Sequence, residues 1–108
     1  MIKNIVKSEL QNKILHLTLN NPKNQNTLCE KMIKQLNDKL LKASEDKNTK
    51  VIILSSTGPV FCAGHNLKDL KTKRSELDKG KSYYKKIFKS CSNLMINIVK
   101  NPKPVIAA

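Results

Sequence analysis

Residues 51–67 constrain the fold of this chain most, because an apolar run there breaks into a glycine turn and a helix start. Residues 51–54 are β-branched and apolar without alternation, which is typical of a strand buried on both faces. Residues 57–59, Thr-Gly-Pro, end the run. Gly64 permits a backbone conformation closed to other residues, and Asn66 is a favoured helix N-cap. The segment therefore predicts an extended-to-helix turn whose free N–H groups favour an anion.

Alternating and helical patterns divide the rest of the chain into strands and helices. Residues 2–6 and 13–19 predict a hairpin around Gln11 and Asn12, and residues 50–55 predict a third strand. Thr27 and Glu30 have the spacing of a capping box, which predicts a helix from there to about Asp46. Residues 67–70 predict a short helix, and residues 71–81 predict a charged, mobile loop.

A broad apolar stripe before Pro102 predicts a long helix whose stripe belongs to the core. The stripe consists of Tyr84, Ile87, Phe88, Cys91, Leu94, Met95, Ile98 and Val99. Residues 105–108 predict a last strand. The order strand, strand, helix, strand, helix, strand indicates an α/β fold, with parallel pairing of the later strands.

Three short motifs occur in order along the chain. Residues 17–28 contain an Asn-Pro turn followed by Asn-Thr-Leu, residues 61–68 read Phe-Cys-Ala-Gly-His-Asn-Leu-Lys, and residues 101–108 contain Lys-Pro-Val-Ile-Ala-Ala. Together they resemble the crotonase superfamily, the enoyl-CoA hydratase/isomerase family, over nearly the whole chain. Two positions depart from the family pattern, since Asn66 replaces the usual Asp and Thr27 the usual Ala. The resemblance implies the N-terminal part of a crotonase-like ββα spiral, a mixed sheet with covering helices.

The same resemblance implies a function in fatty acid metabolism. Crotonase-like enzymes stabilise the enolate or oxyanion of a coenzyme A thioester with two peptide N–H groups, and the N–H of His65 would be one of them. Lys23 and Lys68 would contact the coenzyme phosphates. Coenzyme A would enter as part of the substrate, with no other cofactor and no metal ion. The candidate substrate-binding and coenzyme-binding residues are Lys23, Ala63, Gly64, His65, Asn66, Leu67 and Lys68.

The length of 108 residues predicts one domain at most. The resemblance implies that residues 1–108 are the N-terminal fragment of a single crotonase-like domain, because the family's second oxyanion donor and acid/base carboxylates follow the strand at 105–108. Asp69, Glu76 and Asp78 are interpreted as capping or solvated charges. The full-length protein is therefore expected to be a lyase or isomerase, assembled as trimers or paired trimers, while the fragment alone is expected to be inactive.

The net charge of +13, from 21 basic and 8 acidic residues, leaves a second class of function open. A small basic module could bind nucleic acid through nonspecific phosphate contacts. The cations are spread along the chain, however, and Arg74 is the only arginine, whereas phosphate and base readout favours clustered arginine. A non-catalytic domain that binds thioesters or a partner is a third possibility.

Three cysteines, Cys29, Cys62 and Cys91, are widely separated and have no Cys-x-x-Cys spacing. This pattern predicts reduced thiols, with Cys29 and Cys91 inside helices as packing residues. Cys62, close to the predicted helix start, is a rival candidate for a nucleophile. The sequence contains no recognisable signal segment, transit composition or membrane span, which predicts a cytoplasmic protein without membrane contact.

Overall fold

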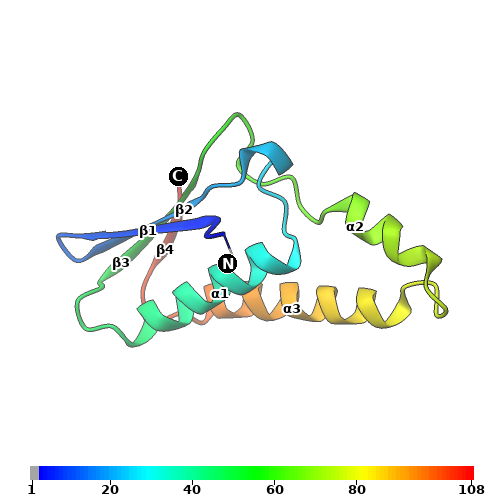
Figure 1. Ribbon diagram of the computed structural model, residues 1–108. Coiled ribbons are helices and arrows are strands. Elements are labelled where there is room, and N and C mark those ends of the chain that lie inside the picture. Colours follow the sequence, from blue (N-terminus) through cyan, green and yellow to red (C-terminus); the bar gives the residue numbers. More distant parts are fainter. Residues whose placement is uncertain (1–2) are drawn as a thin grey trace.

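The computed structural model describes residues 3–108, which form a four-stranded mixed sheet with two long helices on one face (Figure 1). The strands lie in the order β1-β2-β3-β4; β1 and β2 are antiparallel, and the β2/β3 and β3/β4 pairs are parallel. The predicted α/β class and the parallel pairing are confirmed. The elements are β1 (Val6–Gln11), β2 (Ile14–Leu19), α1 (Glu30–Glu45), β3 (Val51–Ser56), α2 (Leu67–Thr72), α3 (Lys81–Val99) and β4 (Val105–Ala107).

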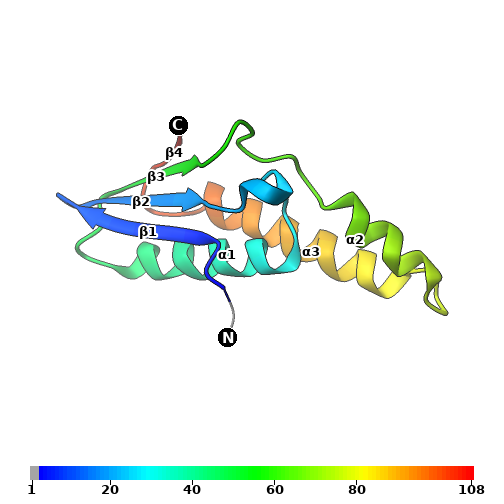
Figure 2. The same ribbon diagram turned by 45° about the horizontal axis from the view of Figure 1, so that its top comes forward.

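The core lies between the sheet and the helices α1 and α3. Figure 2 shows α1 and α3 side by side beneath the sheet, with α3 extending past α1 to α2. On β3, Ile52 and Leu54 are buried in this layer, while Val51 and Ile53 are only half-buried. The prediction of a strand buried on both faces is therefore wrong, because in residues 3–108 the helices cover one face of the sheet. The buried apolar residues are Ile5, Val6, Leu17, Leu19, Met32, Ile33, Leu36, Leu40, Ala43, Ile52, Leu54, Ile87 and Leu94.

The hairpin lies further along the chain than the sequence predicts. Residue 2 is outside the described residues, residues 3–5 are not strand, and β1 begins at Val6. Asn12 and Lys13 form the turn with positive φ angles of 52° and 66°, and Gln11 pairs with Ile14. Residues 7–11, of which all but Leu10 are polar, gave no strand signal because β1 is an edge strand and only its first residue is buried.

Helix α1 begins later than the predicted capping box. It starts at Glu30, its N-cap is Cys29, and no side chain caps it. The backbone N–H of Leu28 instead donates to the carbonyl oxygen of Gly64 at 2.7 Å, which keeps residues 27–28 extended along the glycine turn. The capping role of Thr27 and the helical position of Cys29 were therefore wrong.

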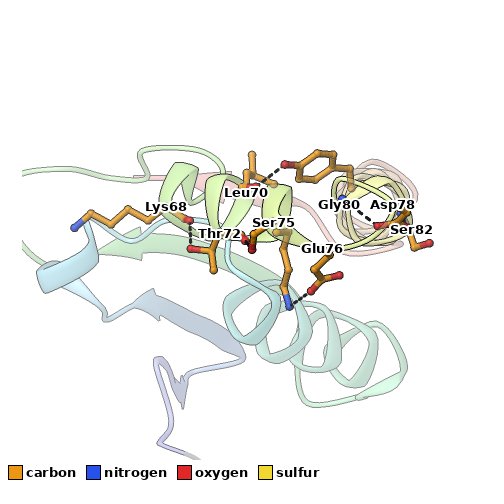
Figure 3. Close-up of polar contacts among 10 residues, drawn as sticks. Lys68, Leu70, Thr72, Ser75, Glu76, Asp78, Gly80 and Ser82 are labelled. Carbon is orange, nitrogen blue, oxygen red and sulfur yellow. Dashed lines mark hydrogen bonds and ion pairs between the residues drawn. The ribbon is translucent and has the colours of Figure 1, made fainter.

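Residues 71–81 are helical and turn-like rather than an irregular loop. Helix α2 continues to Thr72, a 3-10 turn follows at Lys73–Ser75, and α3 begins at Lys81 (Figure 3). The Asp78 carboxylate accepts the N–H groups of Gly80 at 3.0 Å and Ser82 at 2.9 Å, so it caps α3 as predicted. In the described residues, no helix has the length and apolar character needed to cross a bilayer.

The Asp78 cap predicts a pH dependence of stability. Hydrogen bonds from Ser82, its side chain first and then its N–H, hold the pKa of the Asp78 carboxyl below its ordinary value of 3.8. Because the folded-state pKa is lower than the unfolded one, this stabilisation is fully present above the unfolded pKa. The stabilisation is lost as the pH falls through the pKa that Asp78 has in the folded state. We expect Asp78→Asn to be less stable than the wild type at neutral pH, and the difference to shrink in acid. Urea unfolding of both proteins across this range would measure it, and a constant difference would contradict it.

The apolar stripe of α3 is only partly core. Ile87 and Leu94 are buried, while Phe88, Met95 and Val99 are exposed by 46%, 43% and 83%. The prediction that the whole stripe is buried is corrected accordingly.

Candidate functional site

One buried side chain joins the loop before α1 to the loop after β3. Asn26 is fully buried, and its side-chain oxygen accepts the N–H of Asn21 at 2.7 Å. Its amide group donates to the carbonyl oxygens of Thr57 at 2.9 Å and Val60 at 3.0 Å. In Figure 1 these loops meet at one end of the sheet. Sequence reasoning assigned no role to the Asn26 side chain, because its partners lie five or more residues away.

Two backbone hydrogen bonds then align the loops beside the glycine turn. The N–H of Ala63 donates to the carbonyl oxygen of Gln25 at 3.1 Å, and Leu28 donates to Gly64 at 2.7 Å. These bonds use the N–H of Ala63 and the carbonyl of Gly64. Within residues 3–108, the N–H of His65 donates to no other protein atom. The N–H groups of Gly64 and Asn66 also donate to no atom of the described residues, so the turn presents consecutive free main-chain donors, His65 among them, at a position held from both sides.

Gly64 has a φ of +86°, and no atom lies within 4 Å of the position that a Cβ would occupy. A side chain here would meet a strained backbone but no neighbouring atom. The need for glycine is therefore conformational. The space in front of the turn is open to the close approach of another molecule.

A hollow of about 420 Å³ opens at this turn. Six of the seven candidate binding residues line it, and the seventh, Gly64, lies between two of them. A separate hollow of about 340 Å³ between α1 and α3 contains none of the candidates. Sequence reasoning missed Asn24, Gln25 and Thr27 as lining residues. The hollow is lined by Lys23, Asn24, Gln25, Thr27, Ala63, His65, Asn66, Leu67 and Lys68.

The charge around the hollow favours an anion. Lys23 and Lys68 line it, and no carboxylate side chain of residues 3–108 does. The side chain of Asn66 accepts the N–H groups of Lys68 at 3.0 Å and Asp69 at 3.2 Å, so the predicted N-cap of α2 is confirmed. An uncharged cap leaves the positive field of the two lysines undiminished.

The His65 side chain is half-buried. It packs edge-on against Phe88 of α3, with the ring centroids 5.1 Å apart and an angle of 71° between the planes. Its Nδ1 atom is buried, and so is the hydroxyl oxygen of Thr27. Neither atom has a hydrogen-bond partner among the described residues.

The three cysteines are free thiols, each half-buried against the core. Burial, and then the nearby Cys62, raises the pKa of the Cys91 thiol. Cys62 does not line the hollow, which removes support for it as a nucleophile there. In the part of the chain that the structure describes, no three metal-ligating side chains converge.

The model of the enoyl-CoA hydratase/isomerase family matches residues 9–108. The chain is 39% identical over 94 residues to the human protein named enoyl-CoA hydratase domain-containing protein 3, mitochondrial, covering 87% of this chain and 29% of that protein. It is 29% identical over 103 residues to a mitochondrial Δ(3,5)-Δ(2,4)-dienoyl-CoA isomerase from Pongo abelii, covering 91% of this chain and 31% of the isomerase.

Solved structures agree with these sequence matches. The crystal structure of human enoyl coenzyme A hydratase domain-containing protein 3 superposes with a TM-score of 0.86 at 36% identity, covering 96% of this chain and 39% of that one. An enoyl-CoA hydratase from Mycobacterium smegmatis gives 0.86 at 33% identity, with 97% and 39% covered. The chain thus spans less than two fifths of each of these relatives. The relatives named as mitochondrial contradict the predicted cytoplasmic location.

Proposed function

The chain belongs to the enoyl-CoA hydratase/isomerase family, and we therefore propose that its hollow binds an acyl-CoA thioester. In this proposal the N–H of His65 is one of two donors to the thioester oxygen. The observation that carries it is the free N–H of His65 in a turn that borders the open space in front of Gly64.

The chemistry of such a site follows from where charge appears. When a thioester forms an enolate or a tetrahedral intermediate, its carbonyl oxygen becomes negative. A peptide N–H that is already oriented stabilises this oxygen without reorganisation, and removal of one such donor costs about 2.7–4 kcal/mol of transition-state stabilisation. Two backbone bonds and the Asn26 side chain hold the loops around His65, which supports a fixed donor.

The phosphates of coenzyme A account for the basic rim. We propose that Lys23 and Lys68, which line the hollow, contact these phosphates, while Ala63 and Leu67 flank the thioester arm. Coenzyme A is then part of the substrate, and no further cofactor is required. The nucleic-acid alternative is not favoured, because the basic residues at the hollow border a glycine turn typical of this enzyme family.

We further propose that these 108 residues bind the thioester without turning it over. Hydration or isomerisation needs a proton donor or acceptor near the acyl chain, and no carboxylate of the described residues lines the hollow. Asp78 caps α3 and Glu76 pairs with Lys73 at 3.2 Å, so neither is available for this role. Trimers or paired trimers remain the assembly that the family resemblance suggests for the full-length protein.

We expect Gly64→Ala to weaken binding of a short 2-enoyl-CoA about tenfold, because the added methyl group enters the open space and strains the turn. Isothermal titration of the wild type and the variant would measure this change. The same titrations with duplex DNA at low and high salt test the alternative function. A wild-type chain that prefers DNA, with steep salt dependence, would contradict the proposal.

Gly80→Ala provides a matched control for the loss of stability. Gly80 also has a φ of +86° but lies at the start of α3, outside the hollow. A Cβ there would lie 3.0 Å from the Lys73 carbonyl oxygen, so this variant is destabilised at least as much as Gly64→Ala. Under conditions in which Gly80→Ala is folded, we expect it to bind the acyl-CoA with wild-type affinity. An equal loss of affinity in both variants would show that the effect of Gly64→Ala does not arise at the hollow.

A further inference from the structure

Two buried polar side-chain atoms of residues 3–108 lack a hydrogen-bond partner, and both belong to residues that line the same hollow. They are the hydroxyl oxygen of Thr27 and Nδ1 of His65. Thr27 is only 9% exposed. Buried hydroxyl groups are nearly always paired in folded proteins, because an unpaired one loses its hydrogen bonds to water without compensation. Because both residues line the same hollow, the missing hydrogen-bond partners are expected from a bound ligand rather than from the fold.

The fold itself gives the Thr27 hydroxyl no role. It does not cap α1, which begins at Glu30 without a side-chain cap. The backbone on either side is fixed, since the N–H of Thr27 donates to Asn24 at 3.1 Å and the N–H of Leu28 donates to Gly64 at 2.7 Å. Thr27 thus directly precedes Leu28, the residue whose N–H bonds to the glycine turn, and Thr27 is one of the residues that line the hollow.

Of the two unpaired groups, Thr27 is the one that can turn. The His65 ring is packed edge-on against Phe88 and would have to leave this contact to move. Rotation of Thr27 about its Cα–Cβ bond exchanges the hydroxyl and methyl positions between staggered rotamers. Because the hydroxyl oxygen is buried although Thr27 lines the hollow, a ligand in the hollow would reach it only after such a rotation.

We propose that Thr27 is a specificity-determining residue, whose hydroxyl donates a hydrogen bond to a carbonyl oxygen in the thioester–pantetheine arm of the bound acyl-CoA. This inference rests on the proposed function. The arm carries neutral amide and thioester carbonyls, which suit a buried neutral hydroxyl. The phosphates carry charge and belong at Lys23 and Lys68, which are exposed at the rim.

The test compares Thr27→Val with Thr27→Ser. Valine keeps the shape of threonine and replaces the hydroxyl group with a methyl group, so we expect it to weaken acyl-CoA binding about three- to tenfold. The free protein should be as stable as the wild type or more stable, because a buried unpaired polar group has been removed. Thr27→Ser keeps the hydroxyl and should bind within about twofold of the wild type. Isothermal titration and urea unfolding give the two readouts.

Three ligands locate the contact: a short acyl-CoA, the same acyl group on pantetheine, and adenosine 3′,5′-bisphosphate. Thr27→Val should weaken the first two by the same factor and leave the bisphosphate unchanged. Equal affinity of the variant and the wild type for both thioesters would overturn the inference alone. A marked loss of free-state stability in Thr27→Val would also overturn it, because the hydroxyl would then have a partner within the fold. A wild-type chain that binds neither thioester would refute the proposed function and this inference together.

Discussion

Asn26→Ala is expected to lower the free energy of unfolding by about 4 kcal/mol. The substitution removes three hydrogen bonds and leaves the Asn21 N–H and the carbonyl groups of Thr57 and Val60 without that partner. Asn26 also has a φ of 53°, a conformation that asparagine tolerates better than alanine. Because small domains are stable by only about 5–15 kcal/mol, this loss is a large share of the total.

Urea unfolding followed by circular dichroism would measure the change. Asn24→Ala is the matched control, since Asn24 is the same residue type two positions away with an exposed side chain; its effect should stay within about 0.5 kcal/mol. Asn26→Gly permits the positive φ and removes the same hydrogen bonds, so its difference from Asn26→Ala isolates the backbone contribution. A loss below about 1 kcal/mol in Asn26→Ala would show that this side chain does not join the loops in solution.

Leu94→Ala is expected to cost about 3 kcal/mol of stability. Leu94 is fully buried on α3 and belongs to the core between the sheet and the helices α1 and α3. Alanine removes apolar contacts and leaves a cavity that surrounding side chains fill only in part. The substitution should also loosen the position of α3, which carries Phe88 against the His65 ring.

Met95→Ala tests whether burial is the cause. Met95 is the next residue on α3 and is 43% exposed, so its substitution should change stability by less than about 1 kcal/mol. Thermal and urea unfolding of both variants would give the comparison. Similar effects at the two positions would mean that α3 does not pack on the core as described.

Local sequence patterns correctly predicted the elements that depend on residue type and on contacts with near neighbours in the chain. The segment that became β3 is apolar and β-branched, and the predicted strand agrees with the structure within one residue. The last strand and the Asn66 cap were also confirmed, because a cap and the approach to a proline depend on neighbouring residues. These features rest on contacts within a few residues, which a pattern in the chain can indicate.

Distant contacts displaced other elements from their predicted places. The capping box at Thr27 failed because the neighbouring Leu28 bonds to Gly64, which is 36 positions further along the chain. Polar residues form most of β1 because an edge strand needs only one ladder partner and little burial. Part of the apolar stripe of α3 is not covered by any of the described residues, so Phe88, Met95 and Val99 remain exposed.

The amino-acid sequence by itself determined the order of strands and helices, the glycine turn and the family resemblance, since each depends on residue type and local spacing. Only the tertiary structure decided that His65 keeps a free N–H, that Asn26 joins two loops, and that the Thr27 hydroxyl is buried without a partner. Whether a polar group is paired depends on which distant segments meet it. That meeting is a property of the packed molecule and not of any window of the sequence.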